Sequence, residues 1–239
     1  MRGRDPVTRR GLGALAGAAL LVSTGCGLAT PGAPAAGATP TAGGTAGAPA
    51  SLPTVGAAPS GAMVFNVVPG QSRATFRVRE QLVGVQLPSD AVGTTSAVTG
   101  RIVLRREGGI APEASRVSVD LRELRTDDPR RDSFIRGSTL RTSEFPFAEF
   151  MPRTAAGLPN PLPASGEHTF RLSGTMLMRG VARDLTWDVT ARRAGTQLSA
   201  RATTTVRFGD FGMTPPRADP VVMVVDEVRL ELDLVAAQS

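Results

Sequence analysis

Apolar and polar residues alternate along most of the chain that follows residue 63. The alternation is strict in five segments, which cover residues 73–79, 116–122, 169–173, 185–189 and 227–234. A period of two places the apolar side chains on one face of a β-strand and the charged side chains on the other. Clusters of Gly, Pro, Asp and Asn separate the segments, as the turns between antiparallel strands require. The pattern therefore predicts an all-β fold with one wet face and one apolar face.

The predicted strands meander along the chain, and the seventh and eighth of them form a hairpin. They cover residues 63–68, 73–83, 97–106, 115–122, 146–154, 167–179, 184–193, 196–208 and 221–235. These are nine segments, but we count about eight strands, because one segment is an edge strand or part of a fused pair. A set of this kind predicts a barrel or a sandwich. One short helical insertion is also predicted, because Asp128 can cap a helix and Pro129 suits its first position.

The first 26 residues have the layout of a secretory signal. A positively charged start is followed by an apolar run over residues 11–22, which is shorter than the roughly 20 residues that span a bilayer. A small residue then precedes Cys26, as in the lipobox of bacterial lipoproteins, although Ser23 stands where an aliphatic residue is usual. We predict lipidation of Cys26; the alternative is an ordinary signal peptide with an incidental cysteine. Arg9 and Arg10 also resemble a twin-arginine signal, and every one of these signals leads out of the cytoplasm.

Residues 27–60 contain no charged residue and consist largely of Ala, Gly, Pro and Thr. Such a segment has too few large apolar side chains to offset the chain entropy lost on folding, so we predict a disordered tether. The folded domain is then expected over residues 61–239. We predict a periplasmic or other extracytoplasmic protein that a lipid anchor holds at the cell envelope.

Charge and chemistry exclude several function classes. The net charge is +6, but the first ten residues contribute half of it, and acidic and arginine side chains alternate along the domain. A nucleic-acid partner is not expected, because such proteins concentrate their basic residues. His168 is the sole histidine and the domain has no cysteine, so we predict no metal, no cofactor and no catalytic residues. His168 is interpreted as an exposed residue at the start of a strand.

Several segments, in matching order and spacing, carry a family resemblance. They cover residues 72–78, 98–102, 124–135, 144–150, 172–181 and 207–212. From about Val64 to Val235 the chain resembles the YceI family, bacterial exported lipid-binding proteins. The resemblance implies an antiparallel eight-stranded lipocalin-like β-barrel that binds polyisoprenoid quinones, isoprenyl phosphates or fatty amides inside, for storage or transport. Residues 81–96 form a longer connection than the short turn common in the family.

The predicted lipid-binding residues are the large apolar side chains of the inward face, with Phe134 closing one end of the barrel. They are Phe76, Val78, Ile102, Leu104, Val119, Leu121, Phe134, Phe150, Phe170, Leu172, Met176, Met178 and Trp187. Flexible thioethers such as those of Met176 and Met178 adapt to an irregular ligand. The alternative is a solid-packed barrel that serves as an envelope stress or interaction protein without a ligand. Edge strands could pair in a homodimer, although no specific residue supports one.

Arg130 and Arg131 are the candidates for binding a polar head group, because an arginine at the mouth of a barrel can pair with a phosphate. The alternative, which we favour, is that Asp132 caps local backbone groups while both arginines lie in solvent.

Overall fold

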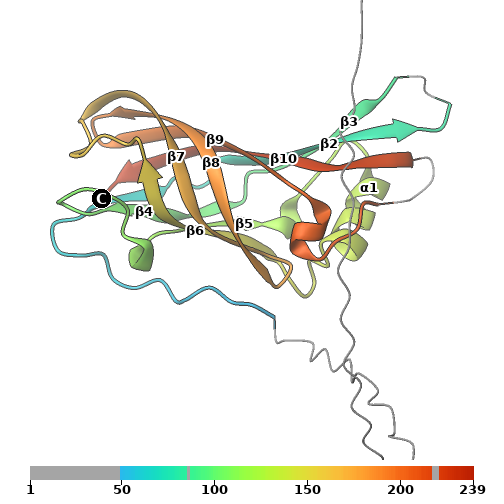
Figure 1. Ribbon diagram of the computed structural model, residues 1–239, viewed down its shortest axis with the longest axis horizontal. Coiled ribbons are helices and arrows are strands. Elements are labelled where there is room, and N and C mark those ends of the chain that lie inside the picture. The colour runs from blue at the N-terminus through green and yellow to red at the C-terminus, as the bar shows by residue number, and fades with distance from the viewer. Residues whose placement is uncertain (1–48, 85–86, 217–220) are drawn as a thin grey trace, which may run out of the picture. The chain divides into compact units, whose positions relative to one another are not determined.

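The computed structural model describes residues 49–84, 87–216 and 221–239. The predicted signal peptide, Cys26 and most of the predicted tether lie outside the described residues. Strands make up most of the described part of the chain (Figure 1). The described residues include no helix that is both long and apolar enough to span a membrane.

The described residues form ten strand segments and five short helical elements. The strands are β1 (Met63–Val67), β2 (Arg73–Leu82), β3 (Ser89–Thr95), β4 (Val98–Leu104), β5 (Arg116–Asp120), β6 (Phe147–Ala156), β7 (Ser165–Met178), β8 (Val181–Ala194), β9 (Gln197–Val206) and β10 (Val221–Gln238). The helical elements are η1 (Pro112–Ala114), η2 (Leu121–Glu123), α1 (Pro129–Phe134), the π-helical turn η3 (Ile135–Thr139) and η4 (Phe208–Phe211).

These segments form a closed antiparallel barrel with eight strand positions. β1 and β2 follow one another along the same edge of β10, and they pair on their other side with β4 and β3 respectively. β1 with β2, and β3 with β4, therefore each act as one broken strand. The remaining strands β5 to β10 pair in chain order and complete the circle. The predicted eight-stranded lipocalin-like barrel with one short helix is confirmed.

β3 is a strand that the alternation pattern did not predict. Its inward positions are Ala91, Gly93 and Thr95, which are buried but small or polar, so the segment shows no apolar alternation. The Phe76 ring of β2 covers Gly93 closely, because an added Cβ at that glycine would lie 2.2 Å from Phe76 Cε1. The long connection over residues 81–96 thus extends the β2–β3 hairpin beyond a simple turn.

The helix α1 lies at the end of the barrel where β2 and β3 meet the start of β10 (Figure 1). It begins as predicted, because the Asp128 side chain accepts a hydrogen bond of 2.8 Å from the Arg130 backbone N–H, and Pro129 opens the helix. The short turn η3 continues it. Leu124, Ile135 and Leu140 pack from this region against the core of the barrel, so residues 121–140 form a lid over this end.

The last residues of the predicted tether make hydrogen bonds with the barrel. Ala50 donates a backbone hydrogen bond of 2.8 Å to Gly180, and Gly56 donates one of 2.7 Å to Glu113. Arg101 in turn donates to the Gly56 carbonyl at 2.5 Å. Residues 49–62 therefore lie along the barrel. Main-chain hydrogen bonds need no large side chain, which is why a composition of Ala, Gly and Pro did not reveal this contact.

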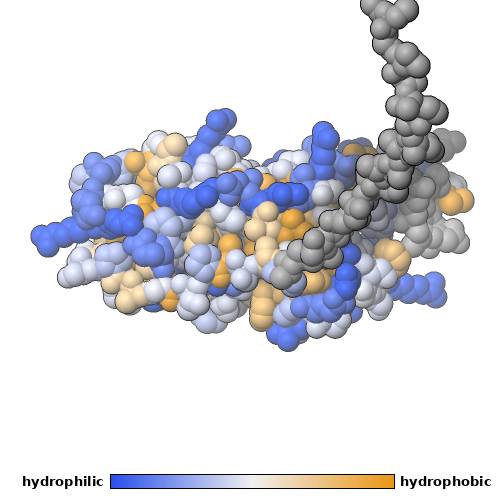
Figure 2. Space-filling view, turned by 60° about the horizontal axis from the view of Figure 1, so that its bottom comes forward, coloured by the Kyte–Doolittle hydropathy of each residue, from blue (hydrophilic) through white to orange (hydrophobic). Residues whose placement is uncertain are grey.

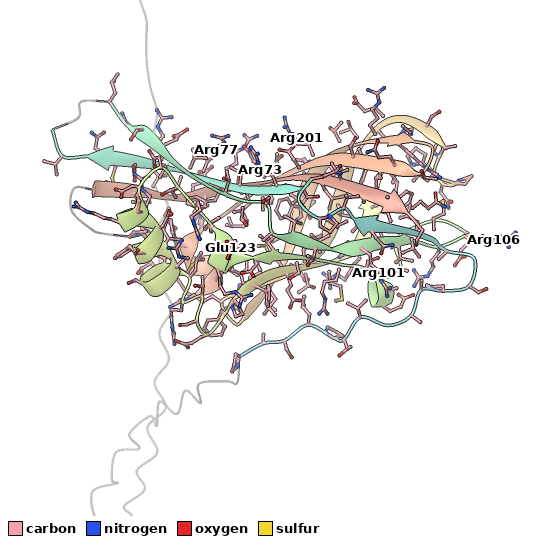
Figure 3. The ribbon with its side chains drawn as sticks, turned by 180° about the vertical axis from the view of Figure 1, so that it is seen from behind. Arg73, Arg77, Arg101, Arg106, Glu123 and Arg201 are labelled. Atoms are coloured by element: carbon pink, nitrogen blue, oxygen red, sulfur yellow. The ribbon has the colours of Figure 1, made fainter. Side chains whose placement is uncertain are left out.

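Charged side chains cover the outer face of the barrel. Figure 2 shows polar residues over much of the visible face with apolar residues between them, and Arg73, Arg77 and Arg201 point away from the barrel (Figure 3). Arg77 pairs with Glu231 at 3.2 Å, and Arg201 pairs with Asp233 at 2.6 Å. Exposed pairs of this kind contribute little because water and salt screen them, so the stability of the barrel comes mainly from its interior.

Gly174 on β7 allows a close approach of two strands. It faces Pro152 of β6 beside a register shift, and an added Cβ would lie 2.3 Å from the Met151 carbonyl oxygen. We expect Gly174→Ala to lower the free energy of unfolding by about 1–3 kcal/mol, because the backbone must shift to admit the methyl group. Urea denaturation followed by circular dichroism measures this change.

Gly137→Ala is the matched control, because Gly137 lies in η3 with open space around its Cβ position. This substitution is expected to leave the stability unchanged or to raise it by up to about 1 kcal/mol. Equal losses in both variants would contradict the close-approach explanation.

Candidate functional site

Two cavities occupy the interior of the barrel. Cavity 1 has a volume of about 180 Å³ and lies under the lid, where Leu124, Ile135 and Leu140 line it. Cavity 2 has a volume of about 110 Å³ and lies toward the β6–β7 connection, from which Leu158 and Leu162 line it. The linings of both are overwhelmingly apolar. The interior is therefore an apolar space that is incompletely filled by side chains.

Twelve of the thirteen predicted lipid-binding residues line these cavities. Cavity 1 is lined by Phe76, Val78, Val119, Leu121, Met176 and Met178, cavity 2 by Ile102, Leu104, Phe170 and Leu172, and both by Phe150 and Trp187. They come together because each strand alternates: along β7, for example, His168, Phe170, Leu172, Met176 and Met178 all point to one face. Their role in binding stays a prediction.

Phe134 is the predicted residue that lines neither cavity. The next residue, Ile135, lines cavity 1 instead. Consecutive helical residues point about 100° apart, so a shift of one position decides which of two apolar neighbours meets the barrel. The short helix offered too few residues for its apolar face to be recognised from the sequence.

Apolar residues of β10 were missing from the prediction. Val228, Leu230 and Leu232 line cavity 1, and Leu232 and Leu234 line cavity 2. The same strict alternation over residues 227–234 that identified the strand also marks these four positions as inward. The signal was present in the sequence.

His168 is not the exposed residue that the sequence suggested. It is half-buried at an inward position of β7 and lines cavity 2, and its Nε2 atom is buried with no hydrogen-bond partner among the described residues. His168 precedes Phe170 and Leu172 with a spacing of two residues, so it lies on the same inward face of the strand. The start of a strand can therefore still lie inside a barrel when the strand is long.

Ion pairs hold the lid on the barrel. Arg131 of α1 donates to the Glu80 carboxylate of β2 at 2.9 Å and also pairs with Asp127, and the Glu80 side chain is only 5% exposed. Asp132 is buried and accepts hydrogen bonds of 2.7 Å from both the backbone N–H and the hydroxyl of Thr126. A ligand head group would thus compete with two carboxylates for Arg131.

Arg130, the second predicted head-group residue, is exposed on the lid. In the alternative favoured above, Asp132 caps local backbone groups and both arginines lie in solvent. Asp132 does accept a hydrogen bond from the local backbone. Arg131, however, is partly buried in an ion pair and does not lie in solvent. Contact of either arginine with a ligand stays a prediction.

The two carboxylates that border cavity 1 are paired with arginines. Glu149 and Glu231 border cavity 1, but Arg116 binds the first at 3.3 Å, and Arg77 and Arg229 bind the second. In the described part of the chain, no group of three or more His, Cys, Asp or Glu residues is placed to hold a metal ion. The cavities therefore favour an uncharged apolar chain.

A hydrogen bond also secures the first turn of the lid. Asp120 caps η2, which carries Leu121 into cavity 1, and its carboxylate accepts from the Arg122 backbone N–H at 2.9 Å. The hydrogen bond from the Arg122 side chain lowers the pKa of the Asp120 carboxyl from its ordinary value. The cap therefore stays ionised at any neutral pH.

The comparisons with known proteins agree with this geometry. A family model described as a YceI-like domain matches residues 65–236, most of the chain. The chain belongs to the YceI family. The resemblance inferred from the sequence is thereby confirmed, and the YceI-like barrel is a fold that supports lipid binding in general. No curated protein matches the sequence.

Solved structures show the same fold at low sequence identity. A polyisoprenoid-binding domain from Saccharophagus degradans, implicated in plant cell wall breakdown, has a TM-score of 0.56 at 11% identity and covers 73% of this chain and 98% of its own. BcnA of Burkholderia cenocepacia has a TM-score of 0.54 at 17% identity, with coverages of 72% and 99%. A YceI protein of Campylobacter jejuni has a TM-score of 0.50 at 14% identity, with coverages of 66% and 90%.

The Glu80–Arg131 pair yields a test of how the lid is held. We expect Arg131→Met to lower the free energy of unfolding by about 1–3 kcal/mol, because it leaves the buried Glu80 carboxylate without its main partner. Urea denaturation measures the loss. The double variant with Glu80→Gln should recover most of it, since no buried charge remains. A double variant as unstable as the single one would show that the pair is not the source of the effect.

Proposed function

We propose that this protein holds one long-chain apolar or amphiphilic lipid inside its barrel, for storage or transport outside the cytoplasm. The ligand classes are polyisoprenoid quinones, isoprenyl phosphates and fatty amides. The observation that carries the proposal is the pair of adjoining apolar cavities, lined by the inward side chains of the strands. A solid-packed interaction barrel would fill this space.

The energetics of burial support an apolar ligand. Each buried CH₂ group contributes about 0.8 kcal/mol, so three or four isoprene units bring more than ~8 kcal/mol before losses. The loss of freedom on binding takes back several kcal/mol. Micromolar or tighter binding then needs no charged contact inside the barrel.

The volume of the cavities bears on how the ligand enters. An apolar cavity of ~150 Å³ holds one benzene molecule, so the two cavities together hold about two units of that size. A longer chain requires side chains to move. Met176, Met178 and Met213 line cavity 1, and their unbranched thioethers can repack at low cost. The lid offers further room if it lifts.

A related structure supports the isoprenoid class. The Saccharophagus degradans domain is a polyisoprenoid-binding domain, and it shares this fold over nearly its whole length. The similarity is one of fold, and the inward apolar residues of the present chain provide the chemistry that such a ligand needs.

Export and anchoring rest on the N-terminal sequence. The charged start, the apolar run and the Gly25–Cys26 pair support secretion followed by lipidation of Cys26. A single acyl chain binds a membrane only marginally, whereas two or more anchor a protein stably. A diacylglyceryl group on Cys26 would keep the barrel near its lipid source.

Lipid binding is tested on the full chain with Cys26→Ser, which carries no acyl anchor and can be purified without detergent from a bacterial host. This chain is the reference for the barrel variants. Native mass spectrometry with solvent extraction should find a bound species of long-chain mass. Met176→Glu should lose it, because a charge inside cavity 1 excludes an apolar chain. Thr169→Glu, an exposed position of the same strand, should retain it.

Thermal unfolding of both variants checks that they remain folded. If Met176→Glu unfolds, Leu230→Trp, which fills cavity 1 without a charge, takes its place. A homogeneous ligand-free mass for the reference chain, with no thermal shift on adding quinones, isoprenyl phosphates or fatty amides, would overturn the proposed function.

Anchoring is tested separately with Cys26→Ser. We expect the unaltered protein to fractionate with membranes and to incorporate labelled fatty acid, and the variant to do neither, because it lacks the acceptor thiol. Membrane association that survives the substitution would rule out Cys26 as the anchor and leave lipid binding by the barrel unaffected.

A further inference from the structure

The two cavities meet at a wall inside the barrel. Four residues line both of them: Val117, Phe150, Trp187 and Leu232. They belong to β5, β6, β8 and β10, which are distributed around the circle of strands. The wall, defined here as these four residues, therefore crosses the barrel and does not belong to one side of it.

Two aromatic rings form the bulk of this wall. The centroids of Phe150 and Trp187 lie 5.9 Å apart with an angle of 66° between the ring planes, an edge-to-face contact. Such pairs attract beyond the area they bury. The wall is thus a specific contact, and the closed arrangement has its own stabilisation.

Trp187 has a second property that sets it apart. Its side chain is 8% exposed, yet its indole Nε1–H has no hydrogen-bond acceptor among the described residues. A buried indole N–H usually finds a partner. Packing alone therefore holds this ring, and it can turn without breaking a hydrogen bond.

We propose that Phe150 and Trp187 determine how long a ligand chain the barrel accepts. A chain in cavity 1 ends at the wall while the pair is closed, and it reaches cavity 2 only if the rings part. The wall contains no charge, so it selects by length and shape. This inference rests on the proposed function and adds the residues that set its ligand specificity.

The small residues beyond the wall support this assignment. Ala191, Ala200 and Ala202 line cavity 2, and their short side chains leave room there. Two large rings, and not a narrower barrel, therefore separate cavity 2 from cavity 1. Reducing one ring should join the two cavities.

The experiment uses the full chain with Cys26→Ser, which carries no acyl anchor, and a series of isoprenoid alcohols from prenol, with one isoprene unit, to decaprenol as probes. Native mass spectrometry measures the affinity for each. For this reference chain, affinity should rise with the length of the probe up to a certain length, here called the length limit, and then stay constant. In Phe150→Ala the length limit should increase by about one isoprene unit, because cavity 2 is slightly smaller than a benzene-sized cavity. The first probe beyond the original limit should bind about tenfold tighter or more.

Two further variants separate the wall from general effects. Phe211→Ala removes a buried ring that lines neither cavity, and it should leave the length limit unchanged. Adding Ala191→Leu to Phe150→Ala refills cavity 2 and should restore the original limit. Phe150→Leu is the milder substitute if Phe150→Ala does not fold.

The outcomes are distinct. A longer limit in Phe150→Ala that Ala191→Leu reverses supports the role of the wall. An unchanged limit, with the probes still bound, overturns it and leaves the proposed function standing. Failure of the reference chain to bind any probe or extracted lipid overturns both.

Discussion

Closure of the barrel through β10 is the constraint on which the rest of the structure depends. This 18-residue strand pairs with β9 along one edge, and with β2 and then β1 along the other. Because one long strand receives two shorter ones, the circle closes without a free edge between them. Every inward-facing side chain of the eight barrel strands then faces the enclosed interior. Without that closure the alternating apolar residues would line an open groove.

The sizes of the inward side chains decide where that space is empty. Aromatic rings gather in the middle of the barrel, where Phe150 meets Trp187. Alanines occupy inward positions of β8 and β9 on one side of this pair, and flexible methionines of β7 lie on the other. Interiors normally pack to the density of organic crystals. The two cavities are therefore a departure from ordinary packing, at the place where a binding protein needs one.

Polar interactions are concentrated at the rim and on the outside. Glu80 pairs with Arg131 to hold the lid, and Asp132 binds Thr126 beneath it. The carboxylates that border cavity 1 are bound by arginines on the outer face. Burying an unpaired charge costs far more than an apolar contact contributes. Keeping the charges paired at the rim leaves an interior that an apolar chain can enter, while the exposed Arg130 remains at the surface of the lid.

The sequence by itself determined which residues share a face, because alternation and turn residues are local properties of a strand. The alternation predicted an all-β fold and a set of inward residues of which all but Phe134 line the cavities. The capping residue Asp128 predicted the helix start, and the resemblance of several segments to the YceI family implied the eight-stranded barrel. Only the tertiary structure decided which of these inward residues meet. β3 showed no apolar alternation, His168 lies inside despite its polar side chain, and the wall joins residues up to 115 positions apart, from Val117 to Leu232. Distances between strands depend on barrel closure and on side-chain sizes across it, and a local pattern carries neither.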